Sequence, residues 1–119
     1  MTLRQERVNK FLLHEVSEVV SRMNDVRLGF LTVTRAEVSP DMRTAQVGVS
    51  VLGTNEERQA ALKAIKAARG HIRSQISRSA QMRNVPELQF HLDDSVLHSI
   101  RVQELLKQIE NDETTDGSA

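Results

Sequence analysis

The sequence predicts an α+β domain whose elements follow in the order α-β-β-α-α-β and end in a C-terminal helix. Three observations predict this order: the first segment has a helical apolar period, the period changes to two at Phe30, and a single strand pattern returns after Pro86. A hairpin followed by two helices and a returning strand gives a mixed three-stranded sheet with helices packed on it.

The first helix is expected over Leu3 to Met23, where apolar residues recur at steps of three and four. They are Val8, Phe11, Leu12, Val16, Val19, Val20 and Met23. Asn24, Asp25 and Gly29 supply the turn residues that end this helix.

A β-hairpin is expected next. The segment Phe30 to Ser39 is rich in β-branched residues, and Arg43 to Leu52 alternates apolar residues with small or polar ones. Between the two strands, Pro40 presets the backbone for a short turn.

The hairpin is followed by two helices with a break between them. Thr54 and Glu57 match a capping box, and the helix that follows is expected to bury Ala61, Leu62, Ile65 and Ala68. Lys63 and Lys66 then fall on the opposite side. Gly70 is expected to interrupt the helix as a C-cap or a kink, before a shorter helix that buries Ile72 and Ile76.

The end of the chain carries one more strand, one more helix and a tail. Pro86 ends helical structure, Leu88, Phe90 and Leu92 alternate as a third strand, and a last helix is expected over Ser99 to Ile109. Residues 1–109 are therefore expected to form one domain. The acidic tail, residues 110–119, is expected to be disordered because it has no apolar stretch to bury.

Composition excludes several classes of protein. The chain has no cysteine, which excludes disulfides and thiolate metal sites. We expect a cytoplasmic protein, because the N-terminus lacks the apolar run of a signal peptide and no stretch reaches a membrane-spanning length.

The formal net charge of zero conceals a strong segregation of charge. The last ten residues hold four acids and no base, so the other 109 carry 16 basic and 12 acidic residues, a net of +4. The window from Arg58 to Pro86 contains seven basic residues and no acid. A long window of one sign predicts a surface that binds a polyanion, although a solvated basic face would have the same composition.

The junction between the two helices is the best candidate for a phosphate site. Gly70 would let a ligand approach the backbone, and the N–H groups at the start of the second helix would face the ligand. Lys63, Lys66, Arg69 and Arg73 surround the same place. The simpler interpretation is that Gly70 only ends a helix.

Many fragments of the chain resemble the ribosome-binding factor A family, whose members have a KH type II domain with Ala-x-Gly in place of the usual G-x-x-G loop. The match extends from about Arg4 to Ile109 and includes Ala68-Arg69-Gly70, Asp25 with Arg27-Leu28-Gly29-Phe30, Val49-Ser50-Val51-Leu52-Gly53 and Val85-Pro86-Glu87-Leu88. The chain departs from the family pattern at Val26, Gly48, Ser77 and Ser99.

The resemblance implies a KH type II-like fold with a helix–kink–helix, and a factor that binds the immature small ribosomal subunit and its rRNA. It implies help with late maturation, including rRNA processing and folding, and importance in the cold. Other assembly factors are candidate partners, and we expect a monomer that needs no cofactor. The candidate RNA-binding residues are Arg58, Lys63, Lys66, Ala68, Arg69, Gly70, Arg73, Arg78 and Arg83.

The aromatic residues argue against base stacking as the main mode of recognition. The chain has no Trp or Tyr, and Phe11, Phe30 and Phe90 fall in apolar patterns that predict core positions. Recognition is therefore expected to rely on phosphate contacts, which position RNA without reading its sequence.

Two other functions are weighed against RNA binding. His91, Asp93, Asp94 and His98 could bind a divalent metal, but polar residues at a strand end are the simpler interpretation. No P-loop, nucleophile elbow or dinucleotide motif is present, so we expect no enzyme. A pure protein-interaction module remains open, because the first and last helices could offer apolar stripes to a partner.

Overall fold

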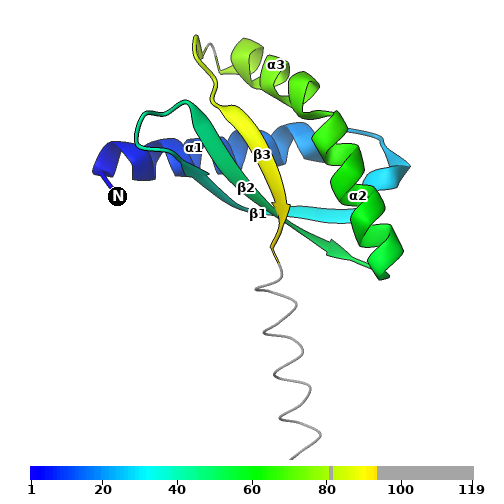
Figure 1. Ribbon diagram of the computed structural model, residues 1–119. Coiled ribbons are helices and arrows are strands. Elements are labelled where there is room, and N and C mark those ends of the chain that lie inside the picture. The colour runs from blue at the N-terminus through cyan, green and yellow to red at the C-terminus, as the bar shows by residue number, and fades with distance from the viewer. Residues whose placement is uncertain (81, 94–119) are drawn as a thin grey trace, which may run out of the picture.

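The computed structural model describes residues 1–80 and 82–93 (Figure 1). Helix α1 (Leu3–Arg22) is followed by the short 3₁₀ helix η1 (Val26–Leu28), strands β1 (Phe30–Val38) and β2 (Thr44–Leu52), helices α2 (Asn55–Ala67) and α3 (Arg69–Ser79), and strand β3 (Glu87–Leu92). This confirms the predicted α-β-β-α-α-β order. The last helix predicted over Ser99 to Ile109 and the tail 110–119 lie outside the described residues.

The sheet has the order β1-β2-β3 and is mixed, as the sequence predicts. β1 and β2 are antiparallel, with Phe30 paired to Leu52 and Val38 to Ala45. β3 returns parallel to β2, with Leu88 beside Ala45 and Phe90 beside Val47. The α2–α3 pair supplies the crossover that a parallel strand requires.

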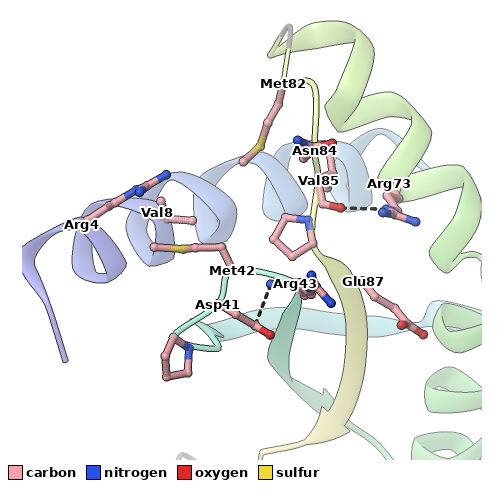
Figure 2. A pocket seen from close by; sticks show the side chains of 12 residues that line it. Arg4, Val8, Asp41, Met42, Arg43, Arg73, Met82, Asn84, Val85 and Glu87 are labelled. Atoms are coloured by element: carbon pink, nitrogen blue, oxygen red, sulfur yellow. Dashed lines mark hydrogen bonds between the residues drawn. The ribbon is translucent and has the colours of Figure 1, made fainter.

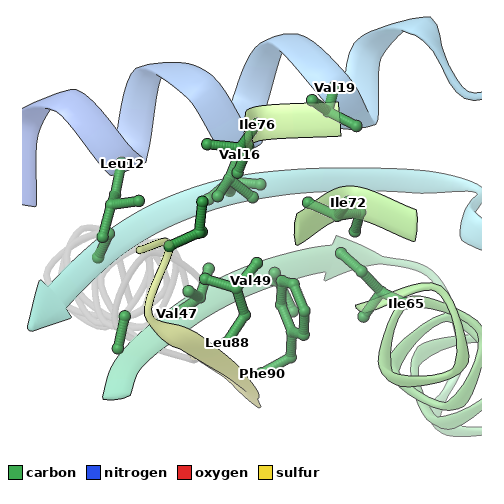
Figure 3. Packing of buried hydrophobic residues seen from close by; sticks show 14 of the residues in the cluster. Leu12, Val16, Val19, Val47, Val49, Ile65, Ile72, Ile76, Leu88 and Phe90 are labelled. Carbon is green, nitrogen blue, oxygen red and sulfur yellow. The ribbon is translucent and has the colours of Figure 1, made fainter. Parts of the chain in front are cut away.

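The hydrophobic core lies between one face of the sheet and the three α-helices (Figure 3). Ala45, Val47 and Val49 all point into it from β2, and each is fully buried. The helices contribute residues at helical spacing, and β3 contributes Leu88 and Phe90. The helical members include Leu12, Val16, Val19, Ala64, Ile65, Ile72 and Ile76. The opposite face of the sheet carries polar side chains, among them the hydrogen-bonded pair Gln46 and Gln89.

A β-bulge in β1 keeps its apolar residues in this core. The register between β1 and β2 shifts between Val33 and Arg35. Leu31 and Val33 face the helices before the shift, and Ala36 and Val38 do so after it. Simple alternation over the strand would have turned one of these pairs to solvent.

The core position predicted for two of the three phenylalanines is wrong. Phe90 is 2% exposed, but Phe30 is 78% and Phe11 38% exposed. Phe30 faces away from the helices because its neighbours Leu31 and Val33 take the inward positions of β1. The molecule therefore presents an exposed aromatic ring at Phe30, which the sequence pattern did not predict.

Capping explains where two of the helices begin. Thr54 accepts a hydrogen bond from the Glu57 N–H at 3.2 Å while the Glu57 carboxylate accepts from the Thr54 N–H, so the predicted capping box is confirmed. Thr2 and Gln5 form a second capping box at α1, which was not predicted. Each box satisfies two N–H groups that the helix cannot pair internally.

Candidate nucleic-acid interface

The junction between α2 and α3 is a break of a single residue. Ala68 has φ −87° and ψ 0°, and its N–H donates to the carbonyl oxygens of Ala64 and Ile65, both at 3.1 Å. The first hydrogen bond of α3 runs from the Ile72 N–H to the Ala68 carbonyl at 3.0 Å. The two helices therefore meet at Ala68 with a kink and without an intervening loop (Figure 1).

Gly70 does not end a helix, so the expectation of a C-cap or kink at that residue is wrong. It is the second residue of α3, and it is exposed. A Cβ built on Gly70 would meet no atom within 4 Å, and its φ does not lie in the left-handed range. Nothing in the described part of the chain thus requires a glycine at position 70. Because glycine has no side chain, a ligand has open space to approach the backbone there.

The start of α3 has N–H groups that precede its internal hydrogen bonds. No side chain caps this helix. The N–H groups of Arg69, Gly70 and His71 come before the bond from the Ile72 N–H to the Ala68 carbonyl. These groups and the positive end of the helix dipole favour an anion at this position.

Four cations lie on the helical turns that flank these donors. At about 100° per residue, Lys63 and Lys66 are roughly 60° apart on α2, and Arg69 and Arg73 are roughly 40° apart on α3. All four side chains are exposed, and none is in an ion pair within the described residues. We call Lys63, Lys66, Arg69, Gly70 and Arg73 the basic stripe.

The other predicted residues are not all part of this stripe. Ala68 is half-buried at the kink itself. Arg58 lies in the first turn of α2, where its guanidinium donates to Asn55 Oδ1 at 3.5 Å. Arg78 follows Arg69 by nine residues and so faces about 180° away from it, and Arg83 lies in the segment between α3 and β3. Six of the nine candidates thus lie within five residues of Ala68 along α2 and α3, and these three arginines lie farther from the kink.

The cluster considered as a metal site is not assembled in the described residues. His91 forms a hydrogen bond with Gln46 on the outer face of the sheet, and Asp93 accepts one from the Thr34 hydroxyl at 2.7 Å. Asp94 and His98 lie outside the described residues. Residues 1–80 and 82–93 contain no group of three His, Cys, Asp or Glu side chains that could hold a metal ion.

Sequence reasoning missed two arginines that the fold brings to the same cleft as Arg73. Arg4 comes from α1 and Arg43 from the β1–β2 turn, and both line a cleft of about 720 Å³ beside the loop that leads into β3 (Figure 2). Neither residue lies in the acid-free window, so no local sequence signal pointed to them.

Within the described residues, no helix is long and apolar enough to cross a membrane.

Comparison with known proteins gives a consistent result. The family model for ribosome-binding factor A matches residues 4–106. A ribosome-binding factor A from Thermomicrobium roseum is 45% identical over 117 residues, which cover 98% of this chain and 91% of that protein.

Solved structures of the same family share the fold. The crystal structure of ribosome-binding factor A from Thermus thermophilus has a TM-score of 0.67 at 26% identity, covering 74% of this chain and 93% of that chain. A homology model of the Thermus thermophilus factor, fitted into a cryo-EM map of its complex with the 30S subunit, has a TM-score of 0.62 at 27% identity, covering 72% of this chain and 91% of that one. The solution structure of a Thermotoga maritima protein described as a putative ribosome-binding factor A has a TM-score of 0.56 at 30% identity, covering 70% and 84%. Sequence, family model and fold agree, and the chain belongs to the ribosome-binding factor A family.

Proposed function

We propose that this chain binds the immature small ribosomal subunit through its rRNA and assists late maturation of that subunit. The observation that carries the proposal is the basic stripe: four exposed cations at a helical kink, none of them in an ion pair within the described residues, next to N–H groups that no side chain caps. The Thermus thermophilus factor with the same fold was fitted into a complex with the 30S subunit, which supports the choice of partner.

The mode of action follows from the chemistry of the stripe. Lysine and arginine side chains and helix N–H groups bind phosphate oxygens, which positions an RNA strand without reading its bases. A protein that holds rRNA in this way favours one arrangement of the strand during its processing and folding. The family resemblance adds that the need for such help is greatest in the cold.

We also infer a cytoplasmic monomer that performs no catalysis, needs no cofactor and has other assembly factors as partners. The absence of catalytic motifs from the sequence and the membership of a ribosome-binding family support this.

Charge reversal tests the proposal. Lys63→Glu with Lys66→Glu removes two cations from the stripe, and we expect the double variant to lose co-sedimentation with immature small subunits. The matched control is Arg7→Glu with Lys10→Glu, which makes the same charge change on exposed residues of α1, away from the stripe. Circular dichroism of both variants shows whether the fold is intact.

Unchanged co-sedimentation of the stripe variant would contradict the proposal. It would favour a protein-interaction module, and the structure offers a surface for one. Val26, Phe30 and Leu52 are 94%, 78% and 56% exposed, and Phe30 pairs with Leu52 across the hairpin.

A further inference from the structure

A second feature of the molecule has the chemistry of a nucleotide site. It is the cleft of about 720 Å³ between the start of α1, the β1–β2 turn and the segment that leads from α3 into β3 (Figure 2). Its volume falls in the range of small-molecule sites in proteins. We call it the arginine cleft, because Arg4, Arg43 and Arg73 line it from three different elements.

The three arginines are available to an anion. All are exposed, and none forms an ion pair in the part of the chain that the structure describes. Arg73 Nε donates to the Val85 carbonyl at 3.0 Å, which orients its guanidinium at the edge of the cleft. The other N–H groups of that guanidinium have no partner among residues 1–80 and 82–93 and can bind phosphate oxygens.

The rest of the lining includes an apolar wall and two acids. Val8, Met42 and Met82 are half-buried and Val85 and Pro86 buried, so together they form the apolar wall. Asp41 and Glu87 also line the cleft and reduce its net charge to +1.

The two acids differ in what they can still bind. Asp41 Oδ1 already accepts from the Ser39 hydroxyl at 2.6 Å and from the Arg43 N–H at 3.1 Å, and these bonds hold the pKa of Asp41 below its ordinary value. Glu87 is exposed and can accept from a ligand.

A nucleotide matches this lining better than a bare anion does. An inorganic anion would contact only the arginines. A nucleotide uses three features of the cleft: its phosphate binds arginine, its base packs on apolar side chains, and an exocyclic amino group donates to a carboxylate such as that of Glu87.

The arginine cleft is also continuous with the basic stripe. Arg73 belongs to both, one helical turn beyond Arg69. We propose that the arginine cleft holds one unpaired ribonucleotide of the RNA strand that follows the basic stripe, with its phosphate at the three arginines and its base against Val8, Met42 and Met82. This inference rests on the proposed function for the source of the nucleotide.

The methionine methyl groups provide a direct test on the full chain. The protein has four methionines, of which Met42 and Met82 line the cleft and Met1 and Met23 do not. We expect 5′-cytidine monophosphate to shift the methyl NMR signals of Met42 and Met82 and to leave that of Met23 unchanged. Inorganic phosphate should not reproduce these shifts, and Arg4→Gln with Arg43→Gln should remove them.

Two results would overturn the inference. If inorganic phosphate gave the same shifts, the cleft would be an anion site without a place for a base. If cytidine monophosphate left both signals unchanged, the cleft would hold no nucleotide. Movement of the signals by a hexaglutamate peptide would then identify the cleft as a site for an acidic protein segment.

Binding of single-stranded RNA separates this inference from the proposed function. We expect Arg4→Gln with Arg43→Gln to make the slope of log K against log salt shallower by about 0.7, the value for the one phosphate that the cleft would neutralise. Arg7→Gln with Lys10→Gln, elsewhere on α1, is the matched control. If the cleft variant binds RNA like the wild type, only the cleft is wrong; if the wild type binds neither RNA nor small subunits, the proposed function is wrong.

Discussion

At the scale of single residues, Gly70 is the position where stability and function should move in opposite directions. It is exposed within α3, with empty space where a Cβ would lie and no left-handed φ to protect. Glycine destabilises the interior of a helix relative to alanine. Because the fold does not require a glycine at position 70, its presence there points to a functional requirement. Close approach of an RNA backbone is the demand that fits its place on the basic stripe.

We therefore expect Gly70→Ala to stabilise the fold by about 0.5–1 kcal/mol and to weaken RNA binding. Urea denaturation measures the first effect, and filter binding of single-stranded RNA measures the second. Ser74→Ala, at another exposed position of α3, is the control for a general effect of alanine. A Gly70→Ala protein that binds RNA as tightly as the wild type would show that the glycine serves no ligand.

The phenylalanines allow a second prediction at this scale. Phe90 fills the core and Phe30 lies on the outer face of the sheet. We expect Phe90→Ala to cost about 3–5 kcal/mol of unfolding free energy. Phe30→Ala should cost less than about 1 kcal/mol, because its ring is mostly exposed. Urea denaturation of both variants checks the contrast, and equal costs would mean that Phe30 is covered.

At the scale of elements, Gly48 allows side chains from the two edges of the sheet to form a hydrogen bond over the middle strand, β2. Thr34 in β1 donates its hydroxyl to Asp93 Oδ2 at 2.7 Å, just after β3, although β2 runs between them. A Cβ on Gly48 would lie 3.1 Å from both Thr34 Oγ1 and Asp93 Cβ. The glycine at position 48 thus makes room for a hydrogen bond over the sheet.

A double-mutant cycle tests this account of Gly48. We expect Gly48→Val to destabilise the protein by about 1–3 kcal/mol, because the added side chain collides with Thr34 and Asp93. In a Thr34→Ala background the same substitution should cost less, with a coupling of roughly 0.5 kcal/mol or more. Thermal or urea denaturation of the four proteins gives the coupling, and strict additivity would rule out a contact over Gly48.

At the scale of the whole molecule, net charge is a poor guide to binding. The chain is formally neutral, yet its first 109 residues carry a net of +4 and its acid-free window supplies all the cations of the stripe. Phosphate contacts release counterions from the nucleic acid, so their number is read from salt dependence.

We expect binding of single-stranded RNA to weaken steeply with salt. If the four cations of the basic stripe each contact one phosphate, the slope of log K against log salt should be about −3, at roughly −0.7 per contact. Affinity would then fall by roughly 50-fold between about 50 and 200 mM salt. A slope near zero in a salt titration would mean that phosphate contacts do not drive binding.

The sequence by itself determined the order of the elements and most of their ends. Apolar periods of 3.6 and 2, the Thr54 capping box and the turn at Pro40 act between residues close in the chain, so they can be read without tertiary information. The same is true of the cations at the kink, because Lys63 to Arg73 lie on consecutive helical turns.

Only the tertiary structure decided what distant segments build together. Arg4, Arg43 and Arg73 share a cleft because α1 packs against β1 and β3 returns beside β2. Phe30 is exposed because the register of β1, including its bulge, and the packing of the helices determine which face of β1 is buried. The alternation of apolar residues does not determine this face by itself. These outcomes depend on packing and strand register between segments far apart in the sequence, for which no local pattern exists.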